Sequence, residues 1–261
     1  MSVLVLGAGK MVDAILTGLK ASQDLTQWQI YSPSGVSAAK LAEKVGAQHC
    51  KNLDELPPPS WILVGCKPQQ LRELTTTLSG RFQQVLYVSL LAALPEESQR
   101  NILAVERLIR LMPGLAVEFN EGVSLLCSTS AQAQLEEFQQ IFSRLGTSLI
   151  VSEQELDELT LLTGSGPALF YEFSKNLFES FESLDEAKRE ALVRQVLTGV
   201  GVSVRRSGES LGDLIGNVTS KGGVTIAVLE HWRAGGLKGM ITQGIRAGRK
   251  RSQQIKNSIQ G

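Results

Sequence analysis

The stretch Val3-Leu4-Val5-Leu6-Gly7-Ala8-Gly9-Lys10-Met11-Val12 decides the fold class of this chain. Its apolar start predicts a buried strand, and the glycines lead into an amphipathic stretch from Lys10 to Ala21. A strand, a glycine-rich turn and a helix in this order are the setting of a dinucleotide-binding fingerprint. Gly7 would permit the tight turn, Gly9 would let a pyrophosphate approach the backbone, and the first helical amides would meet its negative charge. Val12 stands where the fingerprint has a small residue, so helix and strand should pack slightly further apart, and a purely structural turn is the alternative.

The same alternation continues to residue 151. Short apolar runs rich in β-branched residues alternate with amphipathic stretches, which is typical of βαβ units on a parallel sheet. We expect strands at 3–6, 29–31, 62–65, 85–89, 108–112, 123–127 and 148–151, and helices at 10–21, 36–45, 68–78 and 131–145. The prediction for residues 1–151 is therefore a Rossmann-like domain, an α/β fold with a doubly wound, mostly parallel sheet.

Residues 152–261 carry only helical patterns, at 153–162, 167–184, 185–206 and 223–256. We expect an all-α C-terminal domain. Its apolar side chains are too many for one buried stripe on each helix. They include Leu169, Phe170, Phe173, Leu177, Phe178 and Phe181. Self-association through these helices, as a homodimer or a higher oligomer, would cover them.

Composition excludes several classes of protein. The 26 basic and 26 acidic residues cancel, so no net field draws the chain to nucleic acid. Cys50, Cys66 and Cys127 have no C-x-x-C spacing, which argues against a disulfide framework and a metal site and favours a reducing compartment. The start lacks a charged leader, and the run from Val85 to Leu94 is far shorter than the roughly 20 residues of a membrane span. We expect a cytoplasmic protein without a membrane partner.

The second predicted strand ends at Tyr31-Ser32-Pro33-Ser34, where an NAD-specific site would present Asp or Glu to the ribose 2′-hydroxyl. Short hydroxyls at Ser32 and Ser34, with Lys40 about one turn further on, suit a 2′-phosphate better. We therefore expect NADPH first and NADH second. An ordinary Ser-Pro turn remains an alternative.

Histidine content indicates the reaction type. Dehydrogenases of alcohols and hydroxy acids need a group that takes or gives the hydroxyl proton. This chain has His49, in an expected edge strand, and His231, deep in a late helix, and both are interpreted as surface or packing residues. An imine nitrogen can arrive already protonated, so its reduction depends more on orientation and charge placement. The pattern favours C=N reduction. A P-loop and a nucleophile elbow are both unsupported by the spacing of residues around Lys10 and Ser165.

Two glycine-rich segments open predicted helices in the second half. Thr163-Gly164-Ser165-Gly166-Pro167-Ala168 has small residues that permit close approach of a chain or ligand. Asn217-Val218-Thr219-Ser220-Lys221-Gly222-Gly223-Val224-Thr225 offers exposed amides and a hydroxyl able to hold a carboxylate. Each segment, taken alone, is better explained by an ordinary capped helix.

Taken together and in this order, the motifs resemble pyrroline-5-carboxylate reductase along nearly the whole chain. The matching stretches are 7–11, 31–34, Cys66-Lys67-Pro68, Arg110-Leu111-Met112-Pro113, 163–168 and 217–225. The last two are the most specific. The resemblance implies a Rossmann-like domain, a helical dimerisation domain, and reduction of 1-pyrroline-5-carboxylate to proline, a step of proline biosynthesis, with NADPH or NADH.

The resemblance also implies site residues by position. The implied cofactor contacts are Gly7, Ala8, Gly9, Lys10, Met11, Ser32, Ser34, Asn52, Cys66, Lys67, Pro68, Ala92 and Asn217. The substrate carboxylate would bind the amides near Gly223 and Val224, with the Thr225 hydroxyl, the implied catalytic group, close to the ring nitrogen. Glu153 matches an acidic position near the substrate.

Several positions depart from the family pattern. Gly114-Leu115-Ala116 replaces a polar Asn-Thr-Pro segment, Leu91 is bulkier than usual, and Val224 stands where Thr or Ala is common. Reduction of another cyclic imino acid is therefore one alternative, and a cofactor-binding regulatory protein with weak catalysis is another. A 3-hydroxyacid dehydrogenase ranks last, because Phe170 occupies about the place of the lysine it needs.

Overall fold

A computed structural model describes residues 2–67, 70–92 and 94–260 of the chain. The chain divides into two compact units, the first made of Met1–Ser165 with Arg251–Gly261 and the second of Gly166–Lys250. The predicted domain boundary after residue 151 follows the end of the sheet and stays a prediction. The first unit also includes the helix that comes after that boundary, α6 (Glu153–Thr163), together with the last residues of the chain.

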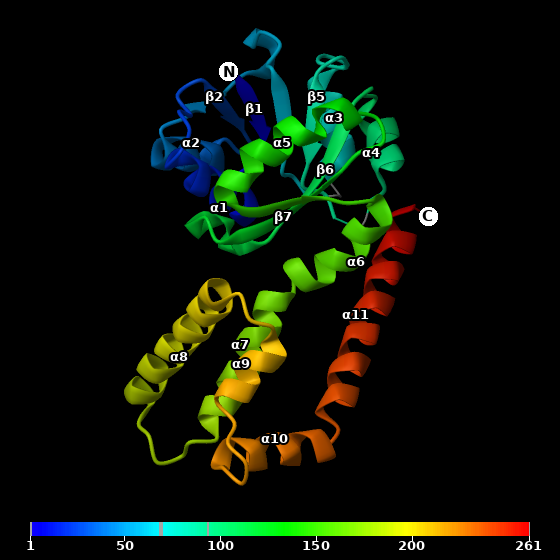
Figure 1. The fold of residues 1–261 in the computed structure, drawn as a ribbon. Helices are drawn as coiled ribbons and strands as arrows, with labels where there is room; N and C mark the ends of the chain where they lie inside the picture. The colour runs from blue at the N-terminus through cyan, green and yellow to red at the C-terminus, as the bar shows by residue number, and fades with distance from the viewer. Residues whose placement is uncertain (1, 68–69, 93, 261) are drawn as a thin grey trace. The chain divides into compact units, whose positions relative to one another are not determined.

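The first unit is built on one sheet. Its strands are β1 (Val3–Leu6), β2 (Trp28–Tyr31), β3 (Gln48–His49), β4 (Trp61–Val64), β5 (Leu86–Ser89), β6 (Leu108–Pro113), β7 (Gly122–Cys127) and β8 (Gly146–Ile150). Their order in the sheet is β3-β2-β1-β4-β5-β6-β7-β8 (Figure 1). All neighbours are parallel except β6 and β7, which are antiparallel. The mostly parallel sheet predicted from the sequence is confirmed.

Helices cover both faces of this sheet. They are α1 (Lys10–Lys20), α2 (Val36–Val45), α3 (Leu71–Leu78), α4 (Glu96–Leu103) and α5 (Leu135–Phe142). Because strand side chains alternate between faces, Val3 and Val5 pack with α1, α2 and α5, whereas Leu4 and Leu6 pack with α3 and α4. Strands buried on both faces explain the continuous apolar runs in the sequence. The fold is doubly wound, as predicted.

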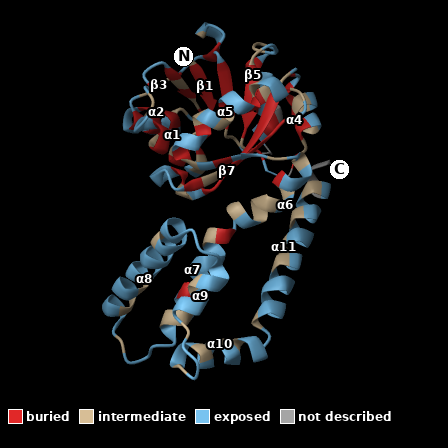
Figure 2. Ribbon diagram, in the orientation of Figure 1, coloured by how far each residue is buried: buried red, intermediate tan, exposed pale blue. Residues whose placement is uncertain are grey.

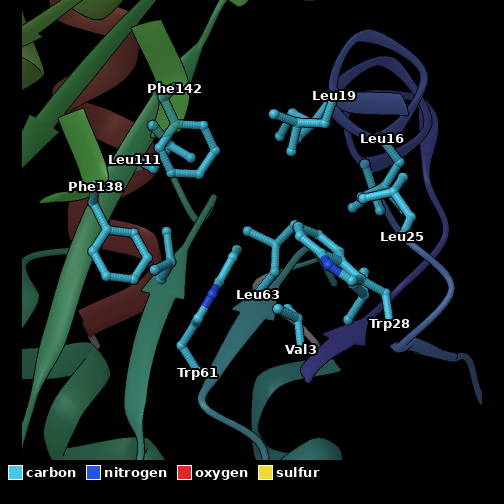
Figure 3. Packing of buried hydrophobic residues seen from close by; sticks show 14 of the residues in the cluster. Val3, Leu16, Leu19, Leu25, Trp28, Trp61, Leu63, Leu111, Phe138 and Phe142 are labelled. Carbon is cyan, nitrogen blue, oxygen red and sulfur yellow. The ribbon is translucent and has the colours of Figure 1, made fainter. Parts of the chain in front are cut away.

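Aromatic side chains fill the centre of the sheet face that α1, α2 and α5 cover (Figure 3). The rings of Trp28 and Trp61, from β2 and β4, meet edge to face with centroids 5.4 Å apart. Phe138 of α5 meets Trp61 in the same way at 5.2 Å. Edge-to-face contacts contribute roughly 0.5–1.5 kcal/mol beyond the burial of the rings. This packing holds α5 against strands that lie more than 70 residues earlier in the chain.

Helix α4 was missed by the sequence analysis because its sequence, EESQRNIL, is mostly polar. Tertiary hydrogen bonds explain why it forms. The Glu96 carboxylate is 1% exposed and accepts hydrogen bonds from the backbone N–H groups of Thr129 (2.6 Å) and Ser130 (3.0 Å). A buried carboxylate is tolerated only when it is hydrogen-bonded in this way.

The second unit contains α7 (Gly166–Glu179), α8 (Glu186–Ser207), α9 (Leu211–Asn217), α10 (Val224–Ala234) and most of α11 (Leu237–Gln260). The prediction of one continuous helix over 223–256 was wrong. The chain breaks at Gly235 and Gly236, and Gly236 has φ +81°, a left-handed conformation that interrupts a right-handed helix. The short helix α9 was not expected either.

The second unit buries few of its side chains (Figure 2). Among its described residues only Gly166 and Ser174 are buried, and Leu169, Phe170, Phe173 and Phe181 are 45–65% exposed. Leu177 and Phe178 are half-buried. A helical unit with this surface lacks a core of its own, which is the pattern expected of a surface that another chain covers. No helix within the described part of the chain is long and apolar enough to cross a bilayer.

Candidate functional site

The turn between β1 and α1 is shaped by two glycines with different requirements. Gly7 has φ +112°, and a Cβ there would lie 2.7 Å from the backbone carbonyl of Gly65. Its N–H donates to the Tyr31 carbonyl at 2.8 Å. Gly9, which precedes α1, has φ −81°, and a Cβ there would meet nothing within 4 Å. Protein packing therefore demands glycine at position 7 but leaves open space in front of position 9.

Gly65 accommodates the bulky Val12. Val12 is 1% exposed, and a Cβ at Gly65 would lie 2.1 Å from its Cγ2 atom. In the usual fingerprint, a small third residue lets the helix pack closely on the strand. Here the helix carries Val12, and the glycine that follows β4 provides the space instead. Gly65 was not among the predicted site residues, although its place directly after the apolar run 61–64 was a signal.

A cavity of about 360 Å³ lies at the carboxyl ends of β1, β2 and β4. It brings together seven of the predicted cofactor residues, namely Gly7, Ala8, Gly9, Ser32, Ser34, Cys66 and Lys67. Ser37, Gln70, Glu73 and Thr77 also line it, and the sequence analysis missed them. Gln70, Glu73 and Thr77 lie at helical spacing, but the sequence does not tell which wall that face of the helix meets. In doubly wound folds, ligands bind at this edge of the sheet, where the strand order reverses.

The β2 end of the cavity suits an anion. Ser32 is 8% exposed, and its hydroxyl lies 3.1 Å from that of Ser37. The turn closes through the Gly35 N–H, which donates to the Ser32 carbonyl at 2.9 Å. Gly35 caps α2 without a side-chain hydrogen bond, and the first turn of α2 contains no acidic residue. The free amides and the positive end of the helix dipole at this point favour negative charge.

Cys66 lines the same cavity as a neutral thiol. Burial raises its pKa to about 11 from the ordinary value of 9.0. Desolvation disfavours the thiolate, so Cys66 does not act as a nucleophile near neutral pH.

In the second unit, Gly223, Val224 and Thr225 open α10. Gly223 precedes the helix without a side-chain cap. Val224 is 83% exposed, and the Thr225 hydroxyl is exposed with no hydrogen-bond partner among the described residues. The Gly223 N–H already donates to the Ser220 carbonyl at 2.9 Å. The amides that follow it in the first turn of α10, beside the Thr225 hydroxyl, can receive a carboxylate.

Comparison with known proteins gives the family. Residues 153–255 match the family of pyrroline-5-carboxylate reductase dimerisation domains, and residues 2–93 match the family described as NADP oxidoreductase, coenzyme F420-dependent. The pyrroline-5-carboxylate reductase of Staphylococcus saprophyticus is 27% identical over 270 residues, which cover 98% of each chain. That of Pasteurella multocida is 28% identical over 267 residues, or 97% of each chain.

The chain belongs to the pyrroline-5-carboxylate reductase family.

Solved structures of the family share the fold. The pyrroline-5-carboxylate reductase of Coxiella burnetii superposes with a TM-score of 0.86 at 22% identity, covering 97% of this chain and 98% of the other. The Plasmodium falciparum pyrroline carboxylate reductase, solved with NADP bound, gives 0.80 at 21% identity and covers 98% of both chains.

Four predicted cofactor residues of the first unit do not line the cavity, which leaves their roles as proposals. Lys10 and Met11 open α1 outside it, and Ala92 is exposed after β5. The Asn52 side chain accepts from the Asp54 N–H at 3.0 Å and donates to Glu55 at 2.8 Å. Asn52 therefore caps the 3₁₀ helix at Leu53–Glu55. Pro68 lies outside the described residues.

Asn217, the one predicted cofactor residue in the second unit, ends α9. Its side-chain amide donates to the Glu209 carboxylate at 3.1 and 3.3 Å. The cavity at the strand ends is lined by first-unit residues alone. A contact between Asn217 and the cofactor therefore stays a proposal.

Glu153, the family's acidic position, is held by neighbours in the first unit. Its Oε1 atom accepts from the guanidinium of Arg110 and from the backbone N–H of Glu96, both at 2.7 Å. Arg110 is 1% exposed and also binds Asp157 at 3.1 Å. The Oε2 atom of Glu153 has no hydrogen-bond partner among the described residues.

The family departure at Gly114 has a steric cause. A Cβ at this position would lie 2.8 Å from the carbonyl oxygen of Thr163, at the end of α6. The closeness of α6 thus leaves no room for the polar side chain that family members usually carry here.

A group of three or more His, Cys, Asp or Glu residues able to hold a metal ion is not found in the part of the chain that the structure describes.

Proposed function

We propose that this protein is an NAD(P)H-dependent reductase that converts 1-pyrroline-5-carboxylate to proline. The observation that carries the proposal is the cavity at the carboxyl ends of β1, β2 and β4, which is lined by the glycine turn at residues 7–9. Relatives named pyrroline-5-carboxylate reductase cover 97–98% of the chain, which supports the same substrate.

The residues present fit a dinucleotide. The open space in front of Gly9 allows the pyrophosphate to approach the amides that open α1. Lys67, exposed at the rim, adds a positive charge for phosphate. At the β2 end, the serines and the uncapped α2 favour NADPH over NADH, because a 2′-phosphate gains anion-binding groups there. The acidic side chain that lines the cavity, Glu73, lies on α3 rather than at this β2 end.

A bound nicotinamide would supply a hydride to the imine carbon. The chain's own residues then need to hold the substrate and control one proton. We assign the substrate carboxylate to the start of α10 at Gly223 and Val224, where the helix has no side-chain cap. The Val224 N–H would donate to it, because the Gly223 N–H is bonded to the Ser220 carbonyl. The Thr225 hydroxyl would hold the proton at the ring nitrogen, which becomes the secondary amine of proline. Ala92, Asn217 and the segment at Cys66, Lys67 and Pro68 are proposed neighbours of the nicotinamide and its ribose.

Glu153 is proposed to act on the substrate only through its Oε2 atom. The Oε1 atom is already bonded to Arg110 and to the Glu96 backbone. A carboxylate oxygen held beside a protonated ring nitrogen would stabilise its positive charge.

The second unit supports a homodimer. Its exposed apolar side chains would be covered by the same surface of a second copy, because an interface with two-fold symmetry pairs one patch with itself. We place the protein in the cytoplasm, where its cysteines would remain reduced.

The proposal is tested with purified protein by following NADPH and NADH oxidation at saturating 1-pyrroline-5-carboxylate. We expect turnover with both cofactors and a lower KM for NADPH. Thr225→Val should lower kcat, whereas Thr225→Ser, which keeps the hydroxyl, should retain most of it. Binding of dinucleotide without turnover would favour the regulatory alternative. Faster turnover on a six-membered cyclic imino acid would favour the other substrate class, which the departures at Val224 and Gly114 suggest.

A further inference from the structure

His49 lies beside the turn that closes the β2 end of the cavity. A Cβ built on Gly35 would be 3.6 Å from the Nε2 atom of His49 and 3.7 Å from its Cε1 atom. Strand β3 holds the imidazole there, because His49 pairs with Ile30 of the parallel strand β2, two residues before Ser32. The side chain is half-buried and has no hydrogen-bond partner within the described residues. An unused ring N–H is thus held next to Gly35, between Ser34 and the first amides of α2.

The neighbouring polar groups at this turn are already in use or remain exposed. Asn52 was expected here from the sequence, but its side-chain amide accepts a hydrogen bond from the Asp54 N–H and donates one to Glu55. Ser32 and Ser37 share a hydrogen bond with each other. Neither Lys40 nor His49 lines the cavity itself, but Lys40 is exposed on α2 whereas His49 is half-buried. His49 therefore offers a ring N–H without a partner among the described residues, on a side chain that is half-buried beside this turn.

We propose that His49 is a specificity residue for the 2′-phosphate of NADPH. The inference rests on the proposed cofactor and deepens it. A phosphate seated on the amides that open α2 would lie beside the Gly35 turn and within reach of the imidazole. A neutral imidazole donates one N–H, and a hydrogen bond to a charged phosphate oxygen is stronger than one between neutral groups. NADH has a hydroxyl in place of this phosphate, so it gains little from His49.

Calorimetry with 2′,5′-ADP and 5′-AMP isolates this contribution, because the two probes differ only in the 2′-phosphate. We expect His49→Leu to weaken binding of 2′,5′-ADP about tenfold, as loss of a hydrogen bond to a charged group predicts. Binding of 5′-AMP should stay within about twofold. His49→Gln keeps a side-chain N–H donor and should recover most of the loss. Equal melting temperatures for the three proteins would show that the fold is unchanged.

Lys40→Leu is the matched control, since Lys40 is a cationic side chain near this turn. A selective loss of 2′,5′-ADP binding in Lys40→Leu but not in His49→Leu would overturn the proposal. So would equal losses for both probes in His49→Leu, because these would indicate a general disturbance of the cavity. Failure of the wild-type protein to bind either nucleotide would instead remove the proposed function itself.

Discussion

At the scale of single residues, a substitution at Gly9 should affect ligand binding without affecting folding. A Cβ at this position meets no protein atom within 4 Å, and its φ of −81° is accessible to alanine. We therefore predict that Gly9→Ala keeps the wild-type melting temperature within about 2 °C but weakens NADPH binding at least tenfold, which is about 1.4 kcal/mol. Fluorescence titration with NADPH measures the affinity.

Gly7→Ala is the comparison for this prediction. Position 7 has φ +112° and no room for a Cβ beside Gly65, so this variant should lose stability as well as binding. An unchanged NADPH affinity in Gly9→Ala would show that the pyrophosphate does not approach this turn.

Cys66 gives a second prediction at this scale. Burial raises its pKa to about 11, two units above the ordinary 9.0, so at pH 8 its thiolate fraction is about 100-fold lower than that of a free thiol. Alkylation of the folded protein by iodoacetamide at Cys66 should be slow at pH 8 and accelerate about tenfold for each pH unit up to about 11. Mass spectrometry of the modified peptide measures it. A rate that levels off near pH 9 would contradict the assigned burial.

At the scale of elements, the packing of α1 on β4 depends on one pair. A methyl group added at Gly65 would lie 2.1 Å from Val12 Cγ2, so Gly65→Ala should destabilise the protein by about 1–3 kcal/mol through overpacking. Val12→Ala should restore part of this loss, because the two changes move the small residue from strand to helix. A double-mutant cycle in urea measures the coupling, which we expect to exceed about 1 kcal/mol. Additive effects would show that the two residues do not share this space.

A network of ion pairs around Arg110 connects β6, α6 and the last residues of α11, which belong to the first unit. It lies buried on β6, binds Glu153 and Asp157 of α6, and Asp157 in turn binds Lys256 of α11. Arg110→Met removes the cation from two partly buried carboxylates, and we predict a loss of about 3 kcal/mol in the free energy of unfolding.

Lys256→Met is the control for Arg110. It removes only the outer cation, so it should cost about 1 kcal/mol or less. Both free energies are measured by urea unfolding at one protein concentration. Equal costs for the two variants would show that burial of Arg110 does not set the strength of this network.

At the scale of the whole molecule, self-association should stabilise the helical unit. The chain mass is 28.3 kDa, and we expect analytical ultracentrifugation to give at least twice this value. Phe170→Glu, which places a charge on a side chain that is 65% exposed in the single chain, should shift the protein toward monomer. Phe119→Glu is the matched control in the first unit, where the side chain is 72% exposed, and should leave the mass unchanged. A monomeric wild-type protein would contradict the proposed dimer.

Much of the first unit was predictable from the sequence because its signals are local. Apolar runs buried on both faces of a parallel sheet and glycine at a left-handed turn are dictated by neighbouring residues, so the strands and the Gly7 turn were found. Residues brought into the cavity from helices, such as Ser37 and Glu73, could not be found in this way, since their role depends on which wall the helix faces. Helix α4 was missed for a similar reason, because its polar sequence is stabilised by bonds to Thr129 and Ser130.

The sequence alone determined the doubly wound sheet, the all-helical second half and the family, since these follow from the period of apolar residues and from glycine-rich motifs. Only the tertiary structure decided that Gly65 makes room for Val12, that Asn52 is committed to a cap, and that His49 stands beside the Gly35 turn. The physical reason is that hydrophobic period and backbone freedom act between near neighbours in the chain. Steric fit and the choice of hydrogen-bond partners depend on residues that come into contact only after folding.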